Sequence, residues 1–254
     1  MRVSQNELTG LCRRAFEGLG FPPGDHEDAA DMVVWLEQHG LGGVDTLRRA
    51  LTRLTSEPRT AMTRSFEDSS LGVIDAKGNS ILLCGSLAAD LAYAKARRKG
   101  LSVVKIHDCY NRKLMMGYLA RCARRGMNLM AFWRNSEDPV VVEQVVSIRA
   151  YEDYPTLLLY QIEDQDDTLT RNRSVTLIAS PHFSMLQSLH PDPEEATLLQ
   201  VVRPEDFERQ SNRVWEDGLQ VEDDVWYRLK ELSGRTLVEA TEESRNRGAG
   251  EGAE

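Results

Sequence analysis

The sequence predicts a mixed α/β (α+β) fold in which N-terminal helices are followed by a mixed sheet with flanking helices. Three observations support this prediction. Apolar residues recur at helical spacing through residues 4–54. Strand and helix patterns then alternate from Leu71 to Trp133. Beyond that block, strand-like segments follow one another with few helical patterns between them, which favours antiparallel neighbours in a mixed sheet.

The first three elements are predicted to be helices. Ser4 and Glu7 form a capping-box pattern at the start of the first helix. Prolines and glycines separate the helices, because neither residue continues a helix well. The predicted helices lie at 4–19, 25–40 and 47–54, followed by a polar loop at 56–69.

The alternating block begins at Leu71. The segment LGVIDAKG predicts a strand that closes on a turn, and the Ala-rich segment after it predicts a helix that Gly100 caps. LSVVKI predicts the next strand, Lys113–Arg125 a helix, and MNLMAFW a further strand. More strands are predicted at 145–151, 156–162, 174–179 and 197–202, and more helices at 204–213 and 222–232.

These patterns divide the chain into three regions. We expect an N-terminal helical region at residues 1–60 and a mixed-sheet α/β domain with C-terminal helices at residues 61–245. Residues 246–254 are expected to form a flexible tail, because they offer no apolar segment to bury.

Composition and charge exclude several classes of protein. The 254 residues are 41% hydrophobic and 28% charged, as is usual for a globular protein. The net charge of −9 gives no electrostatic reason for a nucleic-acid partner. No apolar run approaches the roughly 20 residues that span a bilayer, and no signal peptide is recognisable. We therefore expect a cytoplasmic protein with neither a nucleic-acid nor a membrane partner.

The sequence also lacks the usual metal and phosphate motifs. The four cysteines are widely spaced and form no CxxC pair, which argues against a zinc site and a disulfide framework. The five histidines show no metal-ligand spacing and are expected at the surface or in turns. There is no GxGxxG motif and no P-loop. No metal site is predicted.

The turn after the LSVVKI strand is dense in side chains that can do chemistry. It runs from His107 to Lys113, where histidine, tyrosine and lysine are candidate acids and asparagine can hydrogen-bond. Cys109 could act as a nucleophile if His107 or Lys113 activated it. An ordinary strand-to-helix turn is the alternative. The candidate catalytic residues are His107, Tyr110, Asn111 and Lys113.

Two other segments could bind an anion. HGLGGVD, at His39–Asp45, has three glycines near a helix start, where free backbone N–H groups could hold an anion, and a helix-to-helix turn is the alternative. SRNRGAG, at Ser244–Gly250, could fold over a carboxylate or phosphate ligand, and a frayed C-terminus is the alternative. The candidate ligand-binding residues there are Arg245, Arg247, Gly248 and Gly250.

Longer segments resemble known families. LGVIDAKGNSILLCGSLAADLAYAKARRKG and GLSVVKI…GYLARCARRGMNLMAFWRNS are similar to the core of the type-2 malate/L-lactate dehydrogenase family, and the N-terminal helices fit it as well. The start (VSQNEL) and the end (VWYRLKELSGRTLVEATEESRNRGAG) resemble an uncharacterised bacterial family, a domain of unknown function distantly similar to those dehydrogenases. The resemblance implies a shortened dehydrogenase fold, NAD(P)H as the candidate cofactor, and a homodimer.

The functional positions depart from the dehydrogenase pattern. In an ungapped alignment over Gly100–Gly126, the histidine of an Asn-His-Phe-Gly-like motif falls on Asn111, which cannot titrate. A Ser-His-Gly motif falls near residues 41–43, where histidine is again missing. The resemblance therefore implies a divergent member that lost the hydride-transfer histidine and acts as a small-molecule binder, with a carboxylate as candidate ligand, or as an accessory metabolic protein. The alternatives are an NAD(P)H-dependent reductase of a small 2-oxo or imino acid with a rebuilt site, and a purely structural dimer partner. Whether the chain is an enzyme stays open.

Overall fold

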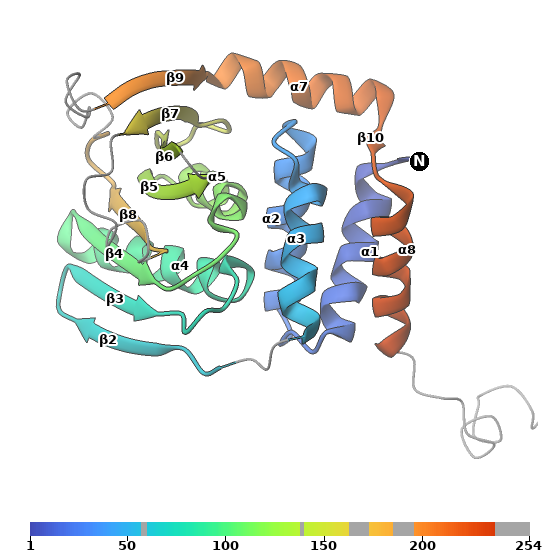
Figure 1. Ribbon diagram of the computed structural model, residues 1–254. Coiled ribbons are helices and arrows are strands. Elements are labelled where there is room, and N and C mark those ends of the chain that lie inside the picture. The colour runs from blue at the N-terminus through green and yellow to red at the C-terminus, as the bar shows by residue number, and fades with distance from the viewer. Residues whose placement is uncertain (57–59, 138–139, 163–172, 185–195, 237–254) are drawn as a thin grey trace, which may run out of the picture.

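The computed structural model describes residues 1–56, 60–137, 140–162, 173–184 and 196–236. In Figure 1 a helical layer stands beside a curved sheet, and α7 (Pro204–Asp217) spans from one to the other. The mixed α+β class predicted from the sequence is confirmed. The C-terminal candidate residues Arg245, Arg247, Gly248 and Gly250, and the predicted tail, lie outside the described residues. The division at residue 60 stays a prediction.

The helical layer contains the three predicted N-terminal helices. Ser4 begins the first with the predicted capping box: its Oγ accepts from Glu7 N at 3.2 Å, and a carboxylate oxygen of Glu7 accepts from Ser4 N at 2.7 Å. Gly24 precedes the second with φ of +88°, a conformation that glycine adopts without a steric penalty. The three helices are α1 (Gln5–Gly18), α2 (Asp25–Gln38) and α3 (Gly43–Ser56).

The C-terminal part of the chain completes this layer. Helix α8 (Asp223–Ser233) lies beside α1 and buries Val225, Leu229 and Leu232 (Figure 1). Strand β1 (Arg2–Val3) pairs antiparallel with β10 (Leu219–Gln220) just before α8 begins. The first and last described elements therefore belong to one packing unit.

The sheet has eight strands in the order β2-β3-β4-β8-β5-β6-β7-β9. Strands β3 and β4 are parallel, and every other neighbouring pair is antiparallel. A mixed sheet was predicted and is confirmed. The strands are β2 (Thr63–Glu67), β3 (Leu71–Asp75), β4 (Ser102–His107), β5 (Asn128–Glu137), β6 (Val140–Ile148), β7 (Thr156–Ile162), β8 (Val175–Ser180) and β9 (Ala196–Val202).

Helices α4 (Ile81–Lys99) and α5 (Met116–Arg124) cover one face of the sheet (Figure 1). Residues from these helices, the sheet and the helical layer share one apolar core. The opposite face of the sheet carries a separate, smaller cluster around Met130, Val145, Leu158 and Tyr160. Among the helices of the described residues, none is both long and apolar enough to cross a membrane.

The structure corrects three details of the sequence prediction. The expected loop at 56–69 contains β2, whose five side chains are all exposed, so no apolar pattern marks it. The strand predicted at 145–151 is β6 and ends at Ile148, because a turn follows in which Tyr151 has φ of +68°. The helix predicted from Lys113 opens as a short 3-10 turn at Arg112–Met115, and α5 begins only at Met116.

Candidate functional site

The 107–113 turn is held by the segment that leads into α4. Ala76 N donates to His107 O at 2.9 Å, Gly78 N donates to Asp108 O at 2.8 Å, and Ile81 N donates to Tyr110 O at 2.8 Å. Backbone groups of the two segments thus pair as an irregular continuation of the parallel β3–β4 ladder. This pairing fixes the direction in which each side chain of the turn leaves the backbone.

Two of the four predicted residues, Tyr110 and Asn111, line one pocket of about 260 Å³. Asn111 sits in the left-handed region with φ of +58°, and its Oδ1 accepts a hydrogen bond from Ser80 Oγ at 3.0 Å. The Tyr110 ring lies under the guanidinium of Arg53, 3.6 Å from the ring centroid. The other polar side chains of the pocket come from Thr60, Lys77 and Asn79.

Cationic side chains line the pocket. Arg53 and Lys77 both line it, and none of the residues that the structure shows lining it is acidic or a histidine. Arg173 adds a third cation at 4.6 Å from the Tyr110 ring centroid. Lys77 pairs with Asp75 at 2.6 Å, and Arg173 Nε pairs with Asp108 at 2.9 Å. Such a surface favours a small anion that can hydrogen-bond to Asn111 and Tyr110.

The other two predicted residues point elsewhere. His107 lies on the opposite face of β4 from the buried Val104 and Ile106. Burial, with the charge of Lys105 as a smaller cause, lowers the pKa of His107. Lys113 Nζ donates to Leu41 O at 2.9 Å. The four candidate side chains therefore do not share one pocket: Tyr110 and Asn111 line it, and His107 and Lys113 do not.

The Lys113–Leu41 hydrogen bond has a further consequence. It joins the 107–113 turn to the His39–Asp45 segment, the second segment in which the sequence suggested anion binding. Both segments on which the dehydrogenase motifs fall are thus neighbours in space. His39 itself lies in the turn after α2, one of the two places expected for the histidines, and is only 6% exposed.

Cys109 is fully buried, and its Sγ lies 3.4 Å from Arg173 O. Burial raises the pKa of the Cys109 thiol to about 12. Because only the thiolate is a good nucleophile, these surroundings argue against a catalytic cysteine here.

Sequence reasoning missed Arg53, Lys77 and Ser80 as pocket residues. Each is brought to Tyr110 by tertiary contacts from α3 or from the turn before α4. The one available signal was Ser80, which precedes an apolar helical run and caps it by accepting from Leu82 N at 3.3 Å.

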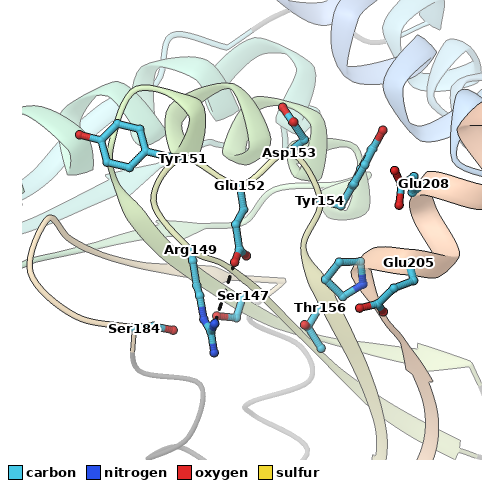
Figure 2. A pocket seen from close by; sticks show the side chains of 11 residues that line it. Ser147, Arg149, Tyr151, Glu152, Asp153, Tyr154, Thr156, Ser184, Glu205 and Glu208 are labelled. Atoms are coloured by element: carbon cyan, nitrogen blue, oxygen red, sulfur yellow. Dashed lines mark ion pairs between the residues drawn. The ribbon is translucent and has the colours of Figure 1, made fainter.

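A larger hollow of about 720 Å³ lies between the β6–β7 connection and the start of α7. Figure 2 shows Arg149 facing Glu152, with which it pairs at 4.0 Å, and Glu205 and Glu208 on α7 across the hollow. Acidic side chains outnumber the single arginine, and none of the predicted site residues lines this hollow. It does not suit a carboxylate. Within the described part of the chain, no group of three or more His, Cys, Asp or Glu side chains could hold a metal ion.

Comparison with known proteins bears on the fold and on the N-terminal part of the chain. Residues 3–80 match a family model described as "Protein of unknown function (DUF3726)". No curated protein sequence matches the chain. Several solved structures are similar in fold, among them three dehydrogenases. A dehydrogenase from Sinorhizobium meliloti is 14% identical, with a TM-score of 0.67, and the match covers 92% of this chain and 99% of that one.

The second similar structure is a malate dehydrogenase from Pyrococcus horikoshii, which is 16% identical, with a TM-score of 0.66 and coverage of 94% and 96%. The third is a sulfolactate dehydrogenase from Methanocaldococcus jannaschii, which is 13% identical, with a TM-score of 0.62 and coverage of 91% and 96%. The likeness in fold therefore extends well beyond the motifs that end at Ser136. The chain therefore shares the fold of these dehydrogenase structures, and its residues 3–80 match a family of unknown function.

Proposed function

We propose that this protein binds a small carboxylate in the pocket over Tyr110 and Asn111, and that it acts as a binding or accessory metabolic protein on a dehydrogenase-like scaffold. One observation carries the proposal. The pocket combines the cations Arg53 and Lys77 with the hydrogen-bonding groups of Asn111 and Tyr110, and the described residues that line it include no carboxylate. An anion of a few heavy atoms fits its volume of about 260 Å³.

Binding fits this pocket better than hydride transfer does. Reduction of a carbonyl needs a proton donor whose pKa lies near the working pH, usually a histidine. Asn111 cannot titrate, and its Oδ1 is already occupied by Ser80. His107 leaves β4 on another side and does not line the pocket.

Calorimetric titration of the full chain with L-malate, L-lactate and pyruvate tests the proposal. We expect at least one of the three to bind, and Arg53→Ala to weaken that binding by about tenfold, or about 1.4 kcal/mol. Arg49→Ala is the matched control, because Arg49 is exposed on the same helix and pairs with Asp45 at 3.0 Å. Absence of binding by all three acids, or an equal effect of both substitutions, would refute the proposed pocket.

A second candidate function is an NAD(P)H-dependent reductase, which the likeness to the Pyrococcus malate dehydrogenase supports. It predicts that NADH or NADPH stabilises the protein. A nucleotide present at tenfold excess over its Kd adds about 1.4 kcal/mol to the free energy of unfolding. If neither nucleotide shifts the melting temperature while a carboxylate does, the reductase hypothesis is refuted and the binding hypothesis is supported.

We also propose a cytoplasmic homodimer. The four cysteines are free and buried, as suits a reducing compartment. Strand β9 is an edge strand without a charge or a proline, and Leu198 and Leu199 are each 50% exposed. The other edge, β2, carries Arg64 and Glu67, which discourage pairing. A second copy can pair with β9 across a two-fold axis without bringing like charges together.

Light scattering tests the dimer. We expect twice the chain mass of 28.7 kDa, and Leu199→Lys should shift the mass toward one chain because it places two like charges at the edge. Leu87→Lys is the control, since Leu87 is 55% exposed on α4, which packs against β3, β4 and β8. A monomeric unsubstituted protein would contradict the proposal.

A further inference from the structure

A further cavity, of about 250 Å³, lies among helices α1, α2 and α5. Residues about one turn apart face it, as the helical period requires: Thr9 comes from α1, Asp31 and Trp35 from α2, and Arg121 and Arg124 from α5. None of the described residues that line it also lines the Tyr110 pocket. The two cavities are therefore separate.

The inner wall of this cavity is apolar. Met32 and Val34 are 0% and 2% exposed, and Trp35 is half-buried. At Gly117 a Cβ would lie 2.8 Å from the Cβ of Trp35, so the absence of a side chain lets α5 approach α2 closely. An apolar group of a few carbon atoms is stabilised by leaving water for such a wall.

The rim of the cavity carries charges of both signs. Asp31 forms neither a hydrogen bond nor an ion pair with any described residue, although the charge of Arg121 acts on it. Arg121 instead pairs with Asp28 at 2.6 Å. Arg124 lies 3.7 Å from Asp153, too far for a hydrogen bond, and both of these side chains are more than half exposed. Desolvation raises the pKa of Asp31, because the neighbouring helices displace part of its water.

We infer that this cavity binds an α-amino acid with an apolar side chain. The ammonium group of such a ligand can pair with Asp31, and its carboxylate with the guanidinium of Arg124, whose planar fork matches two oxygens. The ligand's side chain then rests on Trp35 and the other apolar residues of the inner wall. An amino acid of the size of leucine fits a volume of about 250 Å³, whereas a nucleotide does not.

The two charges select against simpler ligands. A monocarboxylate would bring a second negative charge beside Asp31 and leave that side chain without a partner. A simple amine would be repelled by Arg121 and Arg124. A zwitterion satisfies both signs at once. The ligand expected here therefore differs from that of the Tyr110 pocket, where the described lining residues include no carboxylate.

The indole N–H resonances of nitrogen-15-labelled full-length protein provide the test, with the Trp35 signal assigned from its loss in Trp35→Phe. L-leucine is the probe. The comparison ligands are 4-methylpentanoate, which lacks the ammonium group, 3-methylbutylamine, which lacks the carboxylate, and glycine, which lacks the side chain. We expect leucine to move the Trp35 signal saturably and each comparison ligand to bind at least tenfold more weakly. Trp215 is the internal control, because its side chain is 76% exposed on α7 and reports non-specific contact.

Two substitutions locate the binding site. Asp31→Asn and Arg124→Gln each remove one charge from an exposed position, so both variants should fold. Each should weaken the binding of leucine at least tenfold. Asp25→Asn on α2 and Arg97→Gln on α4 are the matched controls, because neither residue lines the cavity.

Arg53→Ala should leave the binding of leucine unchanged, so this inference and the proposed carboxylate pocket over Tyr110 can fail separately. A Trp35 signal that does not respond to leucine would overturn the inference. The same holds if 4-methylpentanoate or 3-methylbutylamine binds as tightly as leucine, or if both charge variants bind leucine as tightly as the unsubstituted protein does.

Discussion

His39 lies in an aromatic enclosure made by Trp35, Tyr154 and Phe207, with ring centroids 4.2–5.8 Å away. Its Nδ1 contacts Trp35 O at 2.6 Å, and its Nε2 is buried without a partner. Burial lowers the pKa of His39 from its ordinary value of 6.5, because a charged ring could not be solvated there. These contacts join α2, α7 and the β6–β7 connection. Protonation of His39 therefore affects the packing of all three elements.

The sign of the pH effect follows from this lowered pKa. As the pH falls below 6.5, the unfolded chain binds more protons at this position than the folded chain does, so acid favours unfolding. We therefore predict that His39→Phe flattens the loss of stability between pH 7.5 and 5.5, measured by urea denaturation. His26→Phe, at the start of the same helix, is the control. An unchanged slope in His39→Phe would show that other groups cause the acid sensitivity.

Asn111 is a candidate site residue, and it also occupies a backbone position with positive φ. Its φ of +58° is costly for most side chains, by about 1–2 kcal/mol. Asn111→Ala and Asn111→Gly both lose the hydrogen bond with Ser80, so their difference isolates the backbone term. We predict that the alanine variant is less stable than the glycine variant by about 1 kcal/mol in urea denaturation. Equal stability would mean that the turn relaxes to a different conformation.

At the scale of elements, close helix contacts depend on glycine. A Cβ at Gly18 would lie 2.0 Å from the carbonyl oxygen of Leu232, the contact between α1 and α8. Gly10, in the same helix, has Arg14 Nη1 as its nearest neighbour at 3.9 Å. Both glycines therefore lie in α1, but only Gly18 is packed tightly against another helix.

This pair yields a sharp prediction. Gly18→Ala should destabilise the protein by about 2 kcal/mol, because backbone atoms must move apart. Gly10→Ala should stabilise it by up to about 1 kcal/mol through helix propensity. Thermal denaturation of both variants checks the signs, and stabilisation by Gly18→Ala would contradict the α1–α8 contact.

Elements differed in how well the sequence predicted them. Helix α1 was predictable because its capping box and apolar spacing are local. Strand β2 was not, because every one of its side chains is exposed and only pairing with β3 makes it a strand. The extent of β6 depends in the same way on its register with β5.

At the scale of the whole molecule, one apolar core runs through the helical layer and the sheet. Leu229 is fully buried in α8, whereas Tyr227, on the same helix, is 65% exposed. Helix α8 packs on α1, and the same core continues to α4 and α5. A substitution that destabilises α8 should therefore also destabilise the sheet. A boundary at residue 60 would instead allow two independent transitions.

We predict that Leu229→Ala lowers the free energy of unfolding by about 2–5 kcal/mol, and that hydrogen exchange in β5 accelerates together with exchange in α1. Tyr227→Ala is the control and should change neither. Faster exchange in α1 alone would show that the helical layer and the sheet unfold separately.

The sequence by itself determined the mixed fold class, most helices and strands, and the turn at which two site residues lie, because periodicity, capping and turn residues act over a few neighbouring positions. It also identified the dehydrogenase-like scaffold, since the motifs from Leu71 to Ser136 are contiguous. Only the tertiary structure decided which side chains share a pocket. Arg53 meets Tyr110, Lys113 meets Leu41 and Arg112 meets Asn135 across long sequence separations, and strand register and helix packing, which set those meetings, are properties of the assembled chain.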